Sequence, residues 1–141
     1  MSDAARRFAG LTLILVPTIE YGGYFLLTQL LDGQSGYMAN PLRQNFFRAG
    51  HAHAGVLVIL SLVCQVLADW AVLPGAWQWL VRVGVMLAPM LISAGFFFSV
   101  MSVAATAAGG AVVLIYLGAA LLAASVLALG VGLLRARGEA S

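Results

Sequence analysis

The residues of this chain with the clearest capacity for chemistry are its two histidines, His51 and His53, which stand in the stretch NFFRAGHAHAG. A separation of two positions on an α-helix turns the two imidazoles about 200° apart. One ion therefore cannot be bound by both from a regular helix. Zinc needs three or four protein ligands, and the sequence holds no third histidine and a single cysteine, Cys64. The pattern therefore argues against a mononuclear zinc or copper site within one chain.

Haem is the metal cofactor that such a pair could serve, because it brings most of its own ligands. Its iron already has four porphyrin nitrogens, so one axial histidine is enough and the sixth position stays open. Opposed imidazoles fit this scheme if one faces a haem between subunits and the other faces its own bundle. The alternative is that both histidines form hydrogen bonds at the membrane interface and bind nothing. Composition and spacing leave both interpretations open.

Two further polar residues, Arg48 and Glu20, lie next to or within apolar stretches. Arg48 precedes His51 by three positions and could pair with Glu20, with a haem propionate or with a lipid phosphate; snorkelling at the interface is the simpler interpretation. Glu20 stands near the middle of the first apolar stretch, where a carboxyl group becomes protonated or pairs with arginine or histidine. An intramembrane acid of this kind is a candidate functional residue.

The composition indicates the elements that must position these residues. Apolar residues make up 62% of the 141 residues and charged residues 9%, and the mean hydropathy is +1.00. Soluble globular domains carry about 25% charged residues. Four stretches, 8–31, 46–68, 80–101 and 110–134, are almost free of interior charge, and each reaches the roughly 20 residues that cross about 30 Å of hydrocarbon. The sequence therefore predicts an all-α polytopic membrane protein, an antiparallel bundle of four transmembrane helices in the lipid bilayer.

The arginines predict how the bundle is oriented. Five of them flank the apolar stretches at one side of the membrane: Arg6, Arg7, Arg82, Arg135 and Arg137. The positive-inside rule then places both termini and the short middle loop in the cytoplasm, and we expect the cytoplasmic (inner) membrane of a bacterium. Arg43 and Arg48 remain on the outer side, which suggests a local task for them. Because the net charge is +2 and no basic stripe exists outside the membrane flanks, no nucleic-acid partner is expected.

The fourth apolar stretch is rich in Gly, Ala and Ser. Gly118, Ser125 and Gly132 recur at intervals of seven and mark one helical face. Small residues let helix backbones approach closely in lipid. This face is therefore expected to pack against another helix, either within the bundle or in a neighbouring copy. The short connection between the third and fourth stretches predicts a tight antiparallel hairpin.

Two short motifs resemble those of the styrene oxide isomerases, small four-helix membrane proteins with a haem b cofactor. Their second helix opens with Arg-Ala-His-Ser-Gly, which is similar to the combination of Arg48-Ala49 and His53-Ala54-Gly55. Their third helix ends with a Gly-Phe-Tyr-x-Phe-Ser run, and positions 95–99 of this chain read Gly-Phe-Phe-Phe-Ser. The interval between the motifs is nearly the same, and the resemblance spans most of the chain.

The resemblance implies a haem b at the interface between the subunits of a homotrimer. The motif histidine of the family is the axial ligand, and it matches His53, with His51 as the alternative if the two-residue insertion shifts the register. The implied reaction is a Meinwald rearrangement: ferric haem acts as a Lewis acid on the oxygen of a hydrophobic epoxide, and a hydride shift yields an aldehyde. The protein would orient the epoxide and exclude water.

Two positions depart from the family pattern. Ile59 stands where the family has an asparagine and Phe97 where it has a tyrosine, and both family residues help to position the substrate. Phe97 remains a candidate for that role, together with Glu20 and Tyr24 from the first helix. The departures keep two other functions open: a non-enzymatic haem protein for redox or gas binding, and a cofactor-free accessory subunit that packs through its fourth helix.

Overall fold

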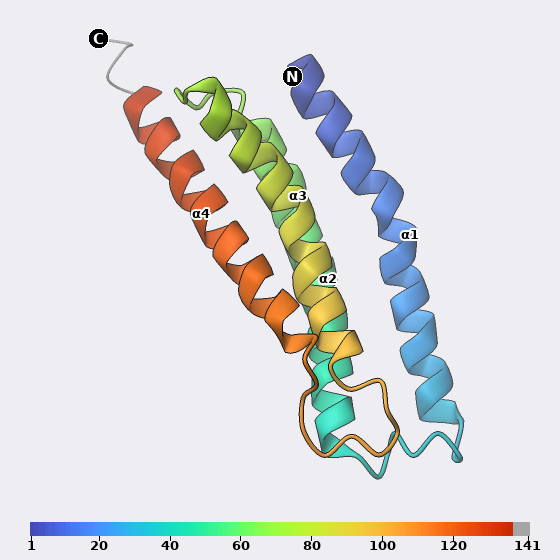
Figure 1. The fold of residues 1–141 in the computed structure, drawn as a ribbon. Coiled ribbons are helices and arrows are strands. Elements are labelled where there is room, and N and C mark those ends of the chain that lie inside the picture. The colour runs from blue at the N-terminus through green and yellow to red at the C-terminus, as the bar shows by residue number, and fades with distance from the viewer. Residues whose placement is uncertain (137–141) are drawn as a thin grey trace.

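The computed structural model describes residues 1–136 and shows four helices in chain order (Figure 1). They are α1 (Asp3–Leu31), α2 (Pro41–Leu67), α3 (Gly75–Phe98) and α4 (Val112–Ala136). All four are long and apolar enough to cross a membrane, and no strand occurs within the described residues. The predicted all-α bundle of four membrane-spanning helices is confirmed. Arg137, which contributed to the predicted orientation, lies outside the described residues.

The first three helices begin several residues before the apolar stretches that predicted them. The Ser2 hydroxyl accepts a hydrogen bond from an amide of the first turn at 3.1 Å, so α1 begins at Asp3. The Asn40 side chain accepts one from the Arg43 amide at 3.1 Å, and Pro41 occupies the first turn of α2. These residue types are preferred at helix starts. Hydropathy thus locates the membrane core, whereas capping residues locate the helix ends.

Helix α3 lies between α2 and α4 and packs against both, and α1 packs mainly against α2 (Figure 1). Helix α1 touches α3 less and does not contact α4. Consecutive helices run in opposite directions, so the N-terminus, the α2–α3 connection and the end of α4 share one end of the bundle, here called the terminal end. The connections 32–40 and 99–111 share the other end, the loop end. Helix α1 is therefore the peripheral helix of the bundle.

The small-residue face of α4 packs within the bundle, which decides between the two alternatives that the sequence left open. Gly118, Ser125 and Gly132 are buried on α4. A Cβ atom at Gly95 of α3 would lie 2.6 Å from the Cγ1 and 2.8 Å from the backbone nitrogen of Ile115. The α3 and α4 backbones therefore approach each other as closely as glycine allows, as the predicted hairpin requires.

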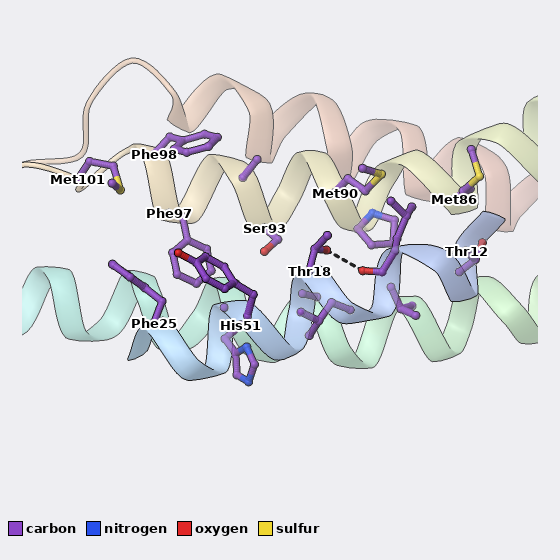
Figure 2. A pocket seen from close by; sticks show the side chains of 18 residues that line it. Thr12, Thr18, Phe25, His51, Met86, Met90, Ser93, Phe97, Phe98 and Met101 are labelled. Carbon is purple, nitrogen blue, oxygen red and sulfur yellow. Dashed lines mark hydrogen bonds between the residues drawn. The ribbon is translucent and has the colours of Figure 1, made fainter. Parts of the chain in front are cut away.

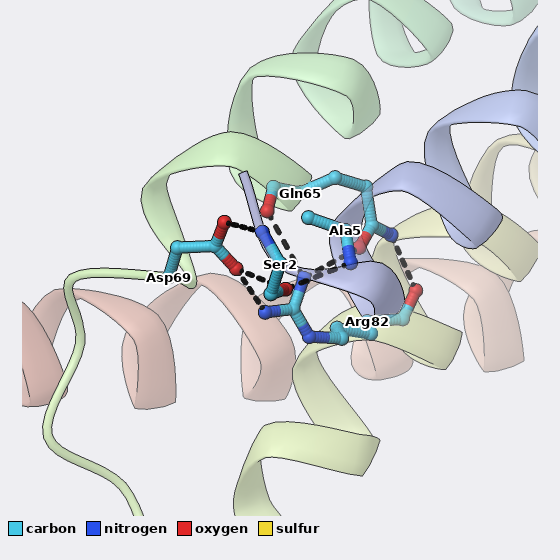
Figure 3. Close-up of polar contacts among 5 residues, drawn as sticks. All are labelled: Ser2, Ala5, Gln65, Asp69 and Arg82. Atoms are coloured by element: carbon cyan, nitrogen blue, oxygen red, sulfur yellow. Dashed lines mark hydrogen bonds and ion pairs between the residues drawn. The ribbon is translucent and has the colours of Figure 1, made fainter.

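A buried arginine joins three segments at the terminal end (Figure 3). Arg82 is 5% exposed, and its guanidinium donates to the Asp69 carboxylate at 2.7 Å and to the Gln65 backbone carbonyl at 3.0 Å. Gln65 donates in return from its side-chain amide to the Arg82 carbonyl at 2.8 Å. The same carboxylate accepts two hydrogen bonds from Ser2, from its backbone N–H and from its hydroxyl, at 2.6 Å each. One carboxylate thereby links α1 to the α2–α3 pair.

Arg82 thus has a structural role beyond the orientation that the sequence assigned to it. It lies inside α3 and is buried, where the sequence suggested a flanking residue at the helix start. Burial acts to raise the pKa of Asp69, but the Ser2 hydrogen bonds and the Arg82 guanidinium outweigh it and lower that pKa to about 2. The carboxylate therefore stays charged at neutral pH, and the link to α1 persists there.

A second buried arginine, Arg43, organises the loop end. It is 3% exposed, and its guanidinium donates to the Val100 carbonyl at 3.3 Å and to the Ser35 carbonyl at 3.1 Å. The guanidinium also lies over the Phe47 ring, 5.2 Å from the ring centroid. The local task expected for Arg43 is therefore to tie the two loop-end connections together.

Gly95→Ala should destabilise the α3–α4 contact by about 1–3 kcal/mol, because its added Cβ meets the Ile115 backbone and overpacking has about this cost. Gly130→Ala in α4 is the matched control, since nothing lies within 4 Å of its Cβ position and alanine favours a helix over glycine. Unfolding in mixed micelles of a mild detergent and dodecyl sulfate measures both variants. Equal midpoints for the two would contradict this packing.

The wild-type protein should lose stability as the pH falls from about 4 to about 2. The pKa of Asp69 is about 2 in the fold and about 3.9 in an unfolded chain. Its contribution is therefore complete above the unfolded value and is lost as the pH falls through the folded value. Asp69→Asn should remove this acid-dependent part, whereas Asp3→Asn, which breaks an exposed pair with Arg6, should retain it. Thermal unfolding in detergent across this pH range measures the effect, and parallel curves for wild type and Asp69→Asn would refute it.

Candidate functional site

The two histidines lie on different faces of α2, as their spacing predicts. His51 is partly buried, and its ring lies against Gly22 and Gly23 of α1. His53 is exposed on the outer surface of the bundle, where it stacks with Phe96 of α3. Helix α2 runs without interruption through both residues. The two imidazoles therefore belong to separate environments, one on the surface and one inside the bundle.

The imidazole of His53 is held in one orientation by its own helix. Its Nδ1 lies 2.7 Å from the Ala49 carbonyl oxygen, and a carbonyl oxygen only accepts, so Nδ1 carries the proton. The neutral ring then has its lone pair on Nε2. Metal-binding histidines typically show this arrangement, in which the other ring nitrogen donates to a backbone carbonyl. His53 is thus prepared to act as a single ligand at the outer surface.

The surface around His53 is apolar and aromatic, and the cation nearest to it in sequence, Arg48, lies on another side of α2. The His53 and Phe96 rings stack with centroids 5.2 Å apart, and Phe46 meets Phe96 edge-on at 5.6 Å. Val56, about one turn further along α2, is also exposed. Arg48 is exposed and forms no ion pair within residues 1–136. It precedes His53 by five positions, so it lies about 7.5 Å nearer the loop end and points about 140° away from the imidazole around α2.

His51 occupies the contact between α1 and α2. A Cβ atom at Gly23 would lie 3.1 Å from the His51 Cε1 and 3.3 Å from its Nε2, and one at Gly22 would lie 3.6 Å from its Nδ1. The two adjacent glycines therefore make room for the imidazole ring. This close approach gives His51 a packing role that requires no ligand.

A cavity of about 480 Å³ lies between α1, α2 and α3 (Figure 2). Its wall is mostly apolar, with aromatic side chains from α1 and α3 and three of the five methionines of the chain, Met86, Met90 and Met101. His51 lies at its edge, and Ser93 points into it from α3. The bundle thus encloses a hydrophobic space on a different side of α2 from His53.

The other residues expected to position a substrate are not brought to His53 within one chain. Phe97 lies inside the bundle, stacked on Phe47 with centroids 5.2 Å apart, and it lines the cavity. Glu20 and Tyr24 are exposed on α1, and among the described residues Glu20 forms no ion pair. The stacking partner of His53 is instead the neighbour of Phe97 in sequence. The structure therefore separates the proposed iron ligand from the proposed substrate contacts.

Sequence reasoning missed the cavity and the glycine pair beside it. The adjacent Gly22 and Gly23 in the middle of an apolar stretch were the available signal, because small residues in a membrane helix mark the close approach of another group. Nothing local in the sequence identifies that group as His51. The cavity depends on three helices together, so no single stretch indicates it.

Comparison with known proteins identified no relative of this chain. No family model matches this chain, and no curated protein and no solved structure matches it. The resemblance to the styrene oxide isomerases therefore rests on the two short sequence motifs around His53 and Phe96.

His51→Ala should lower the stability of the protein, whereas His53→Ala should not. His51 fills the contact between α1 and α2, so its removal leaves a void and has an expected cost of about 1–3 kcal/mol. His53 is exposed and packs on one side only. Thermal unfolding in detergent, without added haemin, measures both variants. A larger loss for His53→Ala than for His51→Ala would show that the packing roles are reversed.

Proposed function

We propose that this chain is a haem b-binding integral membrane protein in which Nε2 of His53 is the axial ligand of the iron. One observation carries the proposal: the Nδ1–H of His53 donates to the Ala49 carbonyl at 2.7 Å, so in the neutral imidazole the lone pair is on Nε2, on an exposed surface. One such imidazole is enough for an iron that already has four porphyrin nitrogens. His51 packs against Gly22 and Gly23, so its ring is less accessible to a porphyrin than that of His53.

The residues around His53 fit the chemistry of a haem. The macrocycle is flat and apolar, and Phe46, Phe96 and Val56 offer an apolar, partly aromatic surface. The propionates are anionic, and Arg48 would meet one with the exposed guanidinium of its long side chain, which starts about 140° around α2 from His53. We therefore assign His53 to the iron and Arg48 to a propionate.

A haem on this surface would remain partly uncovered in a single chain. We propose that a neighbouring copy covers it, in a homotrimer of the kind that the family resemblance implies. The exposed face of α1, with Glu20 and Tyr24, is then available to the site from that copy. In the trimer the Glu20 carboxyl group would contact polar groups of another subunit. A carboxyl group in a membrane needs such a polar partner. We place the protein in the inner membrane of a bacterium, with both termini in the cytoplasm.

The activity that we propose is the isomerisation of a hydrophobic epoxide to an aldehyde. When bound, ferric haem supplies a Lewis acid for an epoxide oxygen. The chain has three tasks: His53 would hold the cofactor, Arg48 would fix its orientation, and the exposed apolar face of α1 from a neighbouring copy would keep water from the positive charge that develops on the epoxide carbon. A substrate that partitions into lipid reaches this site directly.

A haem protein that carries electrons or binds a gas is the second candidate. The observation in its favour is the position of the residues at which the chain departs from the isomerase pattern. Phe97 lies inside the bundle, and Ile59 is exposed further along α2. A cofactor surface without its own substrate-positioning groups suits binding better than catalysis.

Purified wild-type protein should show a Soret band, as isolated or after addition of haemin, and His53→Ala should lose it because the iron loses its axial ligand. His51→Ala is the matched control, since it removes the same residue type two positions away, and it should keep the band. Arg48→Gln should keep the band but weaken haemin binding by about tenfold, because a propionate loses its charged partner. No Soret band in wild type, or a full band in His53→Ala, would refute the proposal.

Assays on one preparation of the haem-loaded protein distinguish the two candidate functions. Turnover of styrene oxide to phenylacetaldehyde, followed by gas chromatography, supports the isomerase. Reversible reduction, or tight binding of carbon monoxide without turnover, supports the redox or gas-binding protein.

A further inference from the structure

We propose that the cavity between α1, α2 and α3 binds a neutral, mainly apolar molecule with one hydroxyl group, such as a phenol or a long-chain alcohol, taken from the bilayer. This site is separate from the His53 surface and does not depend on the proposed haem. Figure 2 shows the side chains around it. Four features support it: the size of the cavity, its uncharged wall, the state of its hydroxyl groups and its opening toward lipid.

The size and the wall of the cavity suit a small organic molecule. Its volume of about 480 Å³ falls within the range of about 300–1,000 Å³ that ligand pockets occupy. Met86 and Met90 contribute flexible, polarisable side chains that adapt to the shape of a guest. Phe25 and Phe97 meet edge-on with centroids 6.2 Å apart and add an aromatic surface. An aromatic or aliphatic guest would make favourable contacts throughout.

The cavity follows from the way in which α1 is held. At the terminal end Ser2 anchors α1 to a carboxylate, and toward the loop end Phe25 packs on two aromatic rings. Between these attachments several of the lining residues are small, among them Gly22, Ala54 and Ala94. Side chains this short leave the space between the helices open. The cavity is therefore a consequence of the fold.

The wall of the cavity, within residues 1–136, carries no carboxylate, ammonium or guanidinium group, and His51 at its edge is packed against Gly22 and Gly23. Among the described residues that line it, none is Asp, Glu, Lys or Arg. Moving an unpaired charge into an apolar site is strongly unfavourable. The molecule that binds here is therefore neutral.

The serine and threonine hydroxyls of the wall have already used their protons, whereas the largely exposed Tyr21 donates to no group among the described residues. Ser93 donates from its Oγ to the Gly50 carbonyl at 3.0 Å. Thr18 donates from its Oγ1 to the Leu15 carbonyl at 2.7 Å, which is the dashed line in Figure 2. Each hydroxyl oxygen keeps lone pairs that accept a further hydrogen bond. The serine and threonine oxygens thus offer acceptors, which an O–H group satisfies and an ether or a hydrocarbon does not.

The cavity opens sideways, toward the lipid-facing surface of the bundle. Phe98 is 61% exposed and Met90 is 42% exposed, although both also line the cavity. Helix α1 makes few contacts with α3, so this side is not sealed. A molecule dissolved in the bilayer can therefore pass between α1 and α3 without crossing water.

The test uses the full chain in phosphatidylcholine nanodiscs, with empty nanodiscs as the blank. The probe is 2-naphthol, and its methyl ether, 2-methoxynaphthalene, is the matched probe without a donor. Equilibrium dialysis should show saturable binding of 2-naphthol, about fivefold tighter than that of the ether, because one hydrogen bond is added. Ser93→Ala should bring the two affinities to within about twofold and leave ether binding unchanged, since it removes an acceptor and little volume.

Three variants locate the site. Ala94→Phe places a ring in the cavity and should abolish the binding of both probes, whereas Ala123→Phe on the exposed side of α4 should leave both unchanged. His53→Ala should also bind both probes as wild type does, so the result is independent of the haem proposal. Equal affinities of wild type for the two probes, normal binding by Ala94→Phe, or loss of 2-naphthol binding in His53→Ala would each overturn the proposal. Non-saturable uptake of both probes would overturn it too, because the cavity would then hold acyl chains only.

Discussion

The buried pairing of Arg82 with Asp69 is the interaction on which the placement of the other helices depends. A guanidinium that is 5% exposed must be matched, because removing one partner of a buried ion pair typically has a cost of about 3–5 kcal/mol. Its partners come from the end of α2 and from the α2–α3 connection, so these two helices are fixed in register. The same carboxylate holds Ser2 at the start of α1. The three helices around the cavity therefore meet at a single acidic side chain at the terminal end.

Features that belong to one helix at a time could be predicted from the sequence. The length of the apolar stretches predicted four spanning helices, and the turn of the α-helix predicted that His51 and His53 face different environments. The seven-residue spacing of Gly118, Ser125 and Gly132 predicted one packing face, and all three are buried on α4. Each of these features depends on the spacing of residues along one helix, and this spacing can be read directly from the sequence.

Contacts between distant segments could not be predicted in this way. Arg82 looks the same in the sequence whether it flanks a membrane helix or binds a buried carboxylate, because its partner stands 13 positions away. The glycine pair indicates a close approach without indicating that His51 makes it. The resemblance associates Phe97 with the haem ligand, yet consecutive residues on a helix point about 100° apart. It is therefore Phe96 that reaches His53, while Phe97 turns into the bundle.

The attachment of α1 through Ser2 also imposes an order on biosynthesis. The residue that holds α1 at the terminal end, Asp69, follows it in the chain by one membrane crossing, α2, and its partner Arg82 stands in the first turns of α3. Helix α1 therefore enters the bilayer before its anchor has been translated, and it must wait there with little of its surface covered. The Asp69 carboxylate that binds Ser2 becomes available once α2 has crossed, and Arg82 pairs with it only when α3 follows. The space beside His51 is therefore complete only when α3, the third helix to be made, supplies its last wall.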